Sequence, residues 1–194
     1  MDSLVKIFGN IHRVKLMRFF LFHPKDSFSF SEIYAHARIK KEDLRKELKL
    51  LVKASFLKEK KQKKGKRTEN RWSLKQNFPF IQGFADILIH QNLLDKKSFL
   101  KSLRKFADLK LVVLSGFFVK DEDREIDLLI VGKSMKREKL IQYIEQLESE
   151  IGKEIRYTLF SVDEFMYRLE MHDKLIRDIF DHKKEVLLAK IEII

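Results

Sequence analysis

The side chains best suited to chemistry in this sequence are lysines and arginines that gather in two neighbouring segments. Seven of the ten residues from Lys58 to Arg67 are basic, and Gly65 lies among them. An earlier segment carries five more, at Lys40, Lys41, Arg45, Lys46 and Lys49. Clustered cations gain affinity for a polyanion by releasing its condensed counterions. The planar fork of an arginine can in addition pair with the edge of a guanine base.

The distribution of charge along the chain also favours a polyanionic partner. The formal net charge is +12, from 41 Lys+Arg and 29 Asp+Glu. Residues 1–77 hold 21 Lys+Arg against 8 Asp+Glu, whereas the remaining residues hold 20 against 21. Charge that serves solubility alone has no reason to segregate in this way, but the charge of a domain that faces nucleic acid does.

Two helices are predicted to precede the basic segment that begins at Lys40. Apolar residues recur at helical spacing over residues 4–22, and Pro24 ends this helix because proline disfavours helical geometry in the residue before it. A short helix follows over residues 32–38. Ser29 or Ser31 is expected to cap it, since a serine oxygen can accept a hydrogen bond from a free amide of the first turn.

A third helix is expected over residues 40–54, and it is amphipathic. Leu44, Leu48 and Leu51 have the spacing i, i+4, i+7 and form an apolar stripe. On the other side of this helix lie Arg45, Lys46, Lys49 and Lys53, and at its start stand Lys40 and Lys41. Arg45 is therefore the candidate for a base contact, and the lysines around it are candidates for contacts with phosphates.

A β-hairpin is expected to follow, with strands over residues 56–60 and 70–74 and a turn over residues 63–67. Three helices and a hairpin in this order resemble the winged helix-turn-helix of transcriptional regulators. The resemblance rests on the hydrophobic positions of Val14–Phe22, Phe28–Ile33, Leu44–Leu57 and Arg71–Leu74. It implies binding to double-stranded DNA, with RNA or an acidic protein surface as alternative partners. The wing would contribute contacts from Lys63, Lys64, Lys66 and Arg67 at the hairpin tip.

A second candidate site lies in the later part of the chain, at Glu125 and Asp127. These carboxylates stand one residue apart, directly before the apolar run Leu128–Val131. The run 125–132 resembles a strand of minimal nucleotidyltransferase domains. The resemblance implies that the two carboxylates hold divalent cations, and hard cations such as Mg²⁺ take oxygen ligands. Three later segments resemble the C-terminal part of such domains: residues 157–165, 176–179 and 185–188.

The nucleotidyltransferase resemblance covers residues 80–194 and implies a two-metal site, but the sequence departs from the family at three points. Ser115-Gly116 reverses the Gly-Ser order of the loop that grips the phosphates. Glu125 replaces a shorter aspartate. The strand Ile155–Leu159, where the family has a third acid, carries no carboxylate and has Arg156 instead.

The expected consequence is a nucleotidyltransferase-like domain without catalysis, used for dimerisation or for binding a ligand or partner. If the site is active, Glu125 and Asp127 would be its catalytic and metal-binding residues, with help from Asp123, and Mg²⁺ its cofactor. The chain would then be a Mg²⁺-dependent nucleotidyltransferase acting on a small molecule, RNA or protein. Otherwise no cofactor is expected, and the six histidines show no metal-ligand spacing.

Together these segments predict an α+β fold. Residues 1–77 form a winged helix-turn-helix domain, residues 78–108 a helical connector with a break near Asp95, and residues 109–194 a nucleotidyltransferase-like α/β domain with a small mixed sheet. In the last part, strands are expected over residues 111–114, 126–131, 155–160 and 186–191, and helices over 137–151, 162–171 and 174–180.

Composition favours a cytoplasmic protein. The sequence has no Cys, which excludes disulfides and fits a reducing compartment. Met1 is not followed by the features of a signal peptide, and no apolar run is long enough to span a bilayer, so no membrane partner is expected.

The leading hypothesis is a transcriptional regulator that binds DNA as a homodimer, with the apolar helix Phe80–Leu94 as the contact between copies. A nucleotide or another small molecule remains open as its ligand. The metal-dependent nucleotidyltransferase is the enzymatic alternative. A toxin–antitoxin-like interaction protein, which would use the degenerate domain to bind its partner, is the third hypothesis.

Overall fold

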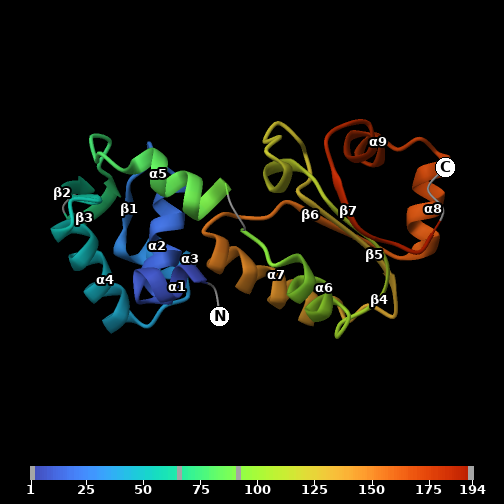
Figure 1. Cartoon of the computed structure of the whole chain (residues 1–194), viewed down its shortest axis with the longest axis horizontal. Coiled ribbons are helices and arrows are strands. Elements are labelled where there is room, and N and C mark those ends of the chain that lie inside the picture. Colours follow the sequence, from blue (N-terminus) through green and yellow to red (C-terminus); the bar gives the residue numbers. More distant parts are fainter. Residues whose placement is uncertain (1–2, 65–66, 91–92, 192–194) are drawn as a thin grey trace. The chain divides into compact units, whose positions relative to one another are not determined.

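The computed structural model describes residues 3–64, 67–90 and 93–191 (Figure 1). Within these residues, helices and two sheets form a mixed α+β protein, as the sequence predicts. The chain divides into two compact units: unit 1 is Met1–Leu93 with Glu145–Glu154, and unit 2 is Leu94–Ile144 with Ile155–Ile194. The predicted connector, residues 78–108, is therefore shared between them. In the described ranges no helix is long and apolar enough to cross a membrane.

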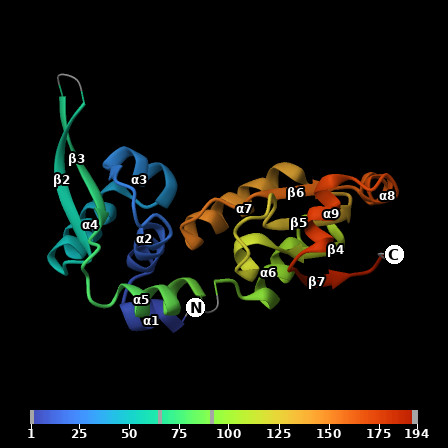
Figure 2. The ribbon, with the colours of Figure 1, turned by 90° about the horizontal axis from the view of Figure 1, so that it is seen from above.

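Unit 1 places helices before a β-hairpin. Its elements up to the hairpin are α1 (Ser3–Phe8), α2 (Ile11–Phe22), β1 (Phe28–Ser29), α3 (Phe30–Ala37), α4 (Lys41–Lys53), β2 (Leu57–Lys64) and β3 (Arg67–Leu74). The strands form an antiparallel sheet in the order β1-β3-β2. The β2–β3 ladder is unbroken from the pair Leu57 and Leu74 to the pair Lys64 and Arg67. The hairpin is therefore longer than predicted, and it extends beyond α3 and α4 (Figure 2).

The single helix predicted over residues 4–22 is wrong, because the chain breaks between α1 and α2. Gly9 has a φ of +76°, which residues with a side chain rarely adopt. Asn10 then caps α2, since its side-chain oxygen accepts a hydrogen bond from the His12 amide at 2.9 Å. The apolar spacing continues across both residues, so periodicity alone hides the break.

A three-residue turn joins α3 to α4, from Arg38 to Lys40. Arg38 ends α3 in the left-handed conformation, with φ 51°. Ile39 is only 2% exposed and belongs to the core of unit 1, which fixes the turn. At the other end of α3, Ser29, one of the two predicted caps, caps the helix in a capping box with Glu32. The other candidate, Ser31, lies inside the helix, which begins two residues earlier than predicted.

The core of unit 1 lies between α2, α3, α4 and the base of the hairpin. The predicted stripe of α4 is confirmed, because Leu44, Leu48 and Leu51 are at most 2% exposed and lie in this core. The burial of this stripe turns the opposite side of α4 outward.

The region that was expected to contact a second copy packs largely against unit 1 itself. It forms α5 (Ile81–Ala85) and the π-helical turn η1 (Asp86–His90). Phe84 and Ile89 pack against the core cluster, and Leu88 is fully buried in it. Two large apolar side chains of this region, Phe80 and Ile87, are exposed.

Unit 2 is built on a four-stranded mixed sheet. Its elements are α6 (Lys96–Leu103), β4 (Asp108–Leu114), η2 (Gly116–Val119), β5 (Leu128–Lys133), α7 (Arg137–Ile151), β6 (Tyr157–Phe160), α8 (Val162–Glu170), α9 (Lys174–Asp181) and β7 (Glu185–Ala189). The strand order is β6-β5-β4-β7, with β5 and β6 parallel and the other pairs antiparallel. The bounds of α7 match the prediction, and its last turns belong to unit 1.

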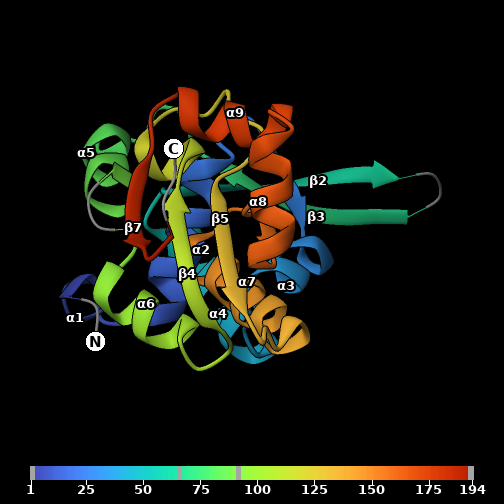
Figure 3. The same ribbon diagram turned by 90° about the vertical axis from the view of Figure 1, so that its right-hand side faces the viewer.

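Helices cover both faces of this sheet. Leu111, Val113 and Leu129 pack with α8 and α9 in one cluster that includes Phe165. The residues that alternate with these along β4 and β5 face the other side of the sheet, where α6 and α7 lie (Figure 3). Because both faces are buried, the continuous apolar runs 111–114 of β4 and 128–131 of β5 lie in the middle of the sheet. Polar side chains can therefore act only at strand ends, and Asp127 stands directly before β5.

Candidate nucleic-acid interface

The basic side of α4 is exposed, as the sequence predicts. The exposed cations on this helix, together with Lys40 directly before it, are Lys40, Lys41, Arg45, Lys46, Lys49 and Lys53. Within the described part of the chain, none of them forms an ion pair. Their charges are therefore uncompensated by neighbouring carboxylates and can meet a polyanion.

Glu47 fixes the rotation of α4 and was not identified from the sequence. Its side chain is buried, with Arg13 Nε 2.9 Å from Oε2 and Asn10 Nδ2 2.8 Å from Oε1. Both partners come from the start of α2. A buried carboxylate is tolerated only with such partners. The only sign of this role in the sequence is that Glu47 is an acidic residue on the same side of the basic helix as its leucine stripe.

An aromatic pair on α3 supports two of the α4 cations. The Arg45 guanidinium lies 5.0 Å from the centre of the Phe30 ring, and Lys41 Nζ lies 5.4 Å from that of Tyr34. The two rings are nearly parallel, with centroids 6.5 Å apart. Cation–π attraction is significant at such distances. This pair was not predicted from the sequence, although the spacing i, i+4 on a helix places both rings on one side.

A groove of about 840 Å³ lies between α4 and the hairpin. Phe30, Leu48 and Trp72 give it an apolar floor, and Arg45 and Lys49 line it from α4. Val52 of α4 adds a further apolar side chain. The remaining lining residues are polar and come from β1, α3 and both hairpin strands: Ser29, Ser31, Glu59, Thr68, Glu69 and Asn70. The groove thus joins a cationic edge to an aromatic surface.

The hairpin continues the basic surface. Lys58, Lys60, Lys61 and Lys63 are exposed, and none of them forms an ion pair with a described residue. Of the predicted wing-tip residues, Lys66 lies outside the described residues, and so do the side chains of Lys64 and Arg67.

The two acids of the hairpin are bound by neighbours on β3. Asn70 Nδ2 donates to Glu59 Oε1 at 2.7 Å, and Arg71 Nη1 lies 2.9 Å from Glu69 Oε1. Arg71 also lies 3.1 Å from Glu32 of α3. The carboxylates are therefore occupied by these donors and are not paired with the lysines of the hairpin.

At the second candidate site, Asp127 is enclosed by hydrogen-bond donors. Its carboxylate is fully buried and accepts four hydrogen bonds. The donors are the Phe117 amide at 3.1 Å, and the Arg156 amide at 2.9 Å, Nε at 2.9 Å and Nη2 at 2.7 Å. The hydrogen bonds with Asp127 raise the pKa of the Arg156 guanidinium. Arg156, which the sequence analysis placed near the site, thus neutralises its buried acid.

The Ser115-Gly116 pair supports this arrangement. Ser115 is buried, and its hydroxyl donates to the Ile126 carbonyl oxygen at 2.6 Å. Gly116 has a φ of +55°, and a Cβ there would overlap the Asp127 carboxylate. The pair therefore packs Asp127 into the protein, and the Phe117 amide that a phosphate loop would present is used by Asp127.

The structure does not bring Glu125 to Asp127 as a pair of metal ligands. The Glu125 carboxylate is 54% exposed and lies 3.0 Å from Lys174 Nζ. This hydrogen bond raises the pKa of Lys174. Asp123 is exposed, and no group of three His, Cys, Asp or Glu side chains in the described ranges could hold a metal ion. Mg²⁺ requires clustered oxygen ligands, so these residues do not fit it.

Comparison with known proteins assigns no family to the chain. No protein-family model matches it, and neither does any curated protein or any solved structure.

Proposed function

We propose that unit 1 is a winged helix-turn-helix that binds double-stranded DNA, and that the chain is a transcriptional regulator. The order of elements supports this proposal, because α3, its three-residue turn and α4 are followed by a long β-hairpin. An exposed helix such as α4 fits the major groove, and a hairpin beside it can contact the neighbouring backbone.

The observation that carries the proposal is the unpaired basic side of α4. Burial of Leu44, Leu48 and Leu51 and the ion pair of Glu47 with Arg13 hold the opposite side of the helix inward. Six exposed cations are thereby directed away from the core, and the hairpin lysines extend the same charge. A rigid cationic surface of this kind favours phosphate contacts.

Unit 2 is a nucleotidyltransferase-like scaffold without catalysis in this proposal. The position of Arg156 supports this role, because the resemblance places the third acid of active relatives on that strand. Here the guanidinium occupies the buried carboxylate of Asp127. Unit 2 then serves as a binding or dimerisation unit of the regulator.

The test is fluorescence anisotropy of labelled duplex DNA at several salt concentrations. Wild-type protein should bind with an affinity that falls steeply as salt rises. The variant Lys46→Ala/Lys49→Ala should flatten the log–log slope by about two, since each phosphate contact contributes about one. The matched control Lys101→Ala/Lys105→Ala removes two exposed cations of unit 2 and should leave the slope unchanged. Absence of binding near about 50 mM salt would refute the proposal.

A further inference from the structure

The geometry of the α4–hairpin groove points to a more specific role for Arg45 than base recognition. We propose that this groove holds the sugar–phosphate backbone of one DNA strand, and that Arg45 binds a phosphate there. This inference rests on the proposed DNA-binding function. It replaces the expectation that Arg45 reads guanine with a contact that is independent of sequence.

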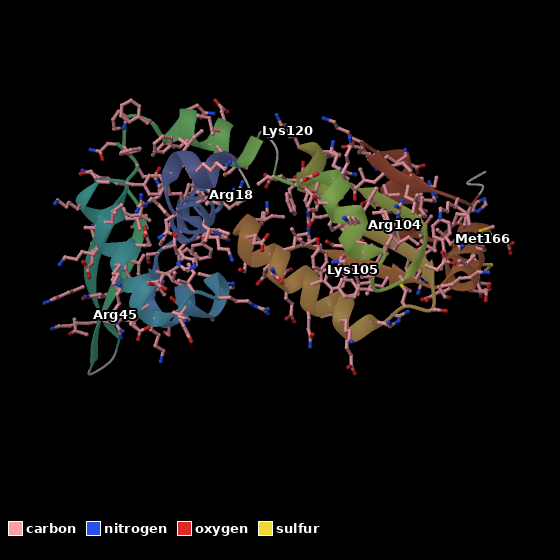
Figure 4. The ribbon with its side chains drawn as sticks, turned by 60° about the horizontal axis from the view of Figure 1, so that its bottom comes forward. Arg18, Arg45, Arg104, Lys105, Lys120 and Met166 are labelled. Atoms are coloured by element: carbon pink, nitrogen blue, oxygen red, sulfur yellow. The ribbon has the colours of Figure 1, made fainter. Side chains whose placement is uncertain are left out.

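The position of Arg45 is the first argument. Its side chain lines the groove, and the guanidinium lies over the Phe30 ring, 5.0 Å from the ring centre. Figure 4 labels the Arg45 side chain on α4. A stacked guanidinium still presents its N–H edge, which matches two phosphate oxygens. Reaching a base would require Arg45 to leave Phe30, because a base-reading side chain extends from the outer side of its helix into the major groove. Lys46, which does not line the groove, lies on that outer side.

The geometry of duplex DNA is the second argument. Adjacent major and minor grooves are separated by one sugar–phosphate backbone. If α4 enters the major groove and the hairpin reaches toward the next minor groove, the backbone between them must pass between α4 and β2–β3. That space is the groove, which is about 840 Å³.

The lining of the groove matches the two chemical parts of a backbone. The aromatic floor of Phe30 and Trp72 suits the apolar face of a deoxyribose, and Arg45 and Lys49 suit the phosphate. Two carboxylates, Glu59 and Glu69, also line the groove. Arg71 Nη1, 2.9 Å from Glu69, offsets one of these charges, whereas the neutral amide of Asn70 holds Glu59 at 2.7 Å without offsetting its charge. Arg45 and Lys49 outweigh the one remaining carboxylate, so the groove keeps a positive balance of charge.

A duplex without guanine separates the two roles of Arg45. In anisotropy measurements, Arg45→Ala should weaken binding about tenfold to a duplex of only A·T pairs and to a mixed-sequence duplex alike, because a charge-assisted phosphate contact is lost from both. It should also reduce the salt slope by about one. Weaker binding to the guanine-containing duplex alone, with an unchanged slope, would overturn the inference and restore Arg45 as a base reader.

Trp72 reports occupation of the groove directly, because it is the only tryptophan in the sequence. Saturating duplex DNA should protect Trp72 fluorescence from quenching by acrylamide. Lys101→Ala, a control in unit 2 outside the proposed interface, should keep this protection once DNA is saturating. Duplex DNA that binds by anisotropy but leaves Trp72 unprotected would contradict the groove assignment while the DNA-binding function stands. Protection by an RNA duplex but not by DNA would also contradict it. Absence of any DNA binding by anisotropy would instead remove the proposed function.

Discussion

The Arg156 guanidinium lies against the fully buried carboxylate of Asp127, with Nη2 2.7 Å from Oδ1 and Nε 2.9 Å from Oδ2. The backbone amide of Arg156 donates to the same carboxylate at 2.9 Å. One residue therefore supplies three of the four hydrogen bonds that Asp127 accepts. This pair holds the start of β5 to the segment before β6, and each carboxylate oxygen of Asp127 accepts two hydrogen bonds.

Removal of Arg156 should destabilise unit 2. In Arg156→Ala the buried Asp127 keeps only its two backbone donors, and a buried charge without a counter-ion is costly. Because the Arg156 side chain is 44% exposed, water offsets part of this cost, and we expect a loss of about 2 kcal/mol in the free energy of unfolding. Urea denaturation measures it. Arg177→Ala, which removes an exposed pair with Asp181 in α9, should change little. Equal effects of the two variants would contradict the account.

Gly116 should not tolerate a side chain. In Gly116→Ala the new Cβ would overlap the Asp127 carboxylate, and the φ of +55° disfavours alanine as well. We expect a loss of about 3 kcal/mol or more, measured by thermal or urea unfolding. Gly83→Ala is the matched control, because a Cβ at that helical position meets no atom within 4 Å. It should be neutral or slightly stabilising. A stable Gly116→Ala protein would show that the loop does not enclose Asp127.

Glu47 should be required for the orientation of α4. Glu47→Ala leaves Arg13 and Asn10 without their carboxylate, so we expect unit 1 to lose about 2–4 kcal/mol of unfolding free energy. Glu47→Gln keeps an acceptor oxygen and should lose less. Glu42→Ala, an exposed acid on the same helix, serves as the control and should leave stability nearly unchanged. Chemical denaturation followed by circular dichroism compares the three, and a Glu47→Ala protein as stable as the control would contradict this role.

The stability that unit 2 gains from the Asp95 cap of α6 should be lost at acidic pH. Asp95 accepts hydrogen bonds from the Ser98 hydroxyl and from the amides of Ser98 and Lys97, and the Ser98 hydroxyl contributes most to lowering the pKa of Asp95. The folded pKa therefore lies below the unfolded value. The stabilisation is complete above the unfolded pKa and is lost as pH falls through the folded pKa.

The pH dependence can be tested with Asp95→Asn, because an asparagine retains an acceptor for the amides but cannot ionise. Melting temperatures of this variant and the wild type should differ most near neutral pH and converge as acid protonates Asp95. A difference in melting temperature that stays constant into the acid range would exclude a contribution from ionised Asp95.

Elements set by local pattern could be predicted from the sequence. The helix over residues 137–151 has the predicted bounds, and the leucine stripe of α4 and the Ser29 cap are confirmed. These features depend on side-chain spacing and on chemistry within one turn. The break at Gly9 escaped prediction because an isolated glycine does not interrupt the apolar spacing around it.

The contacts that define the candidate sites could not be predicted, because they join distant segments. Arg45 meets Phe30 across two helices, and Arg156 meets Asp127 across a β5–β6 crossover that contains α7. The sequence indicated which side of α4 is basic and that an arginine replaces an acid at the second site. It did not indicate that these two arginines already have partners. Partner choice follows from packing, which periodicity does not encode.

The most direct test of the central claim is the salt dependence of DNA affinity with the hairpin charge removed. The variant Lys60→Ala/Lys61→Ala/Lys63→Ala eliminates three exposed lysines of β2, and Lys101→Ala/Lys105→Ala/Lys139→Ala removes three from unit 2 as a control of equal charge. The account predicts that the hairpin variant binds duplex DNA more weakly and loses up to about three units of log–log salt slope, while the control keeps the wild-type slope. Identical slopes for both variants would contradict a winged-helix mode of DNA binding by this hairpin.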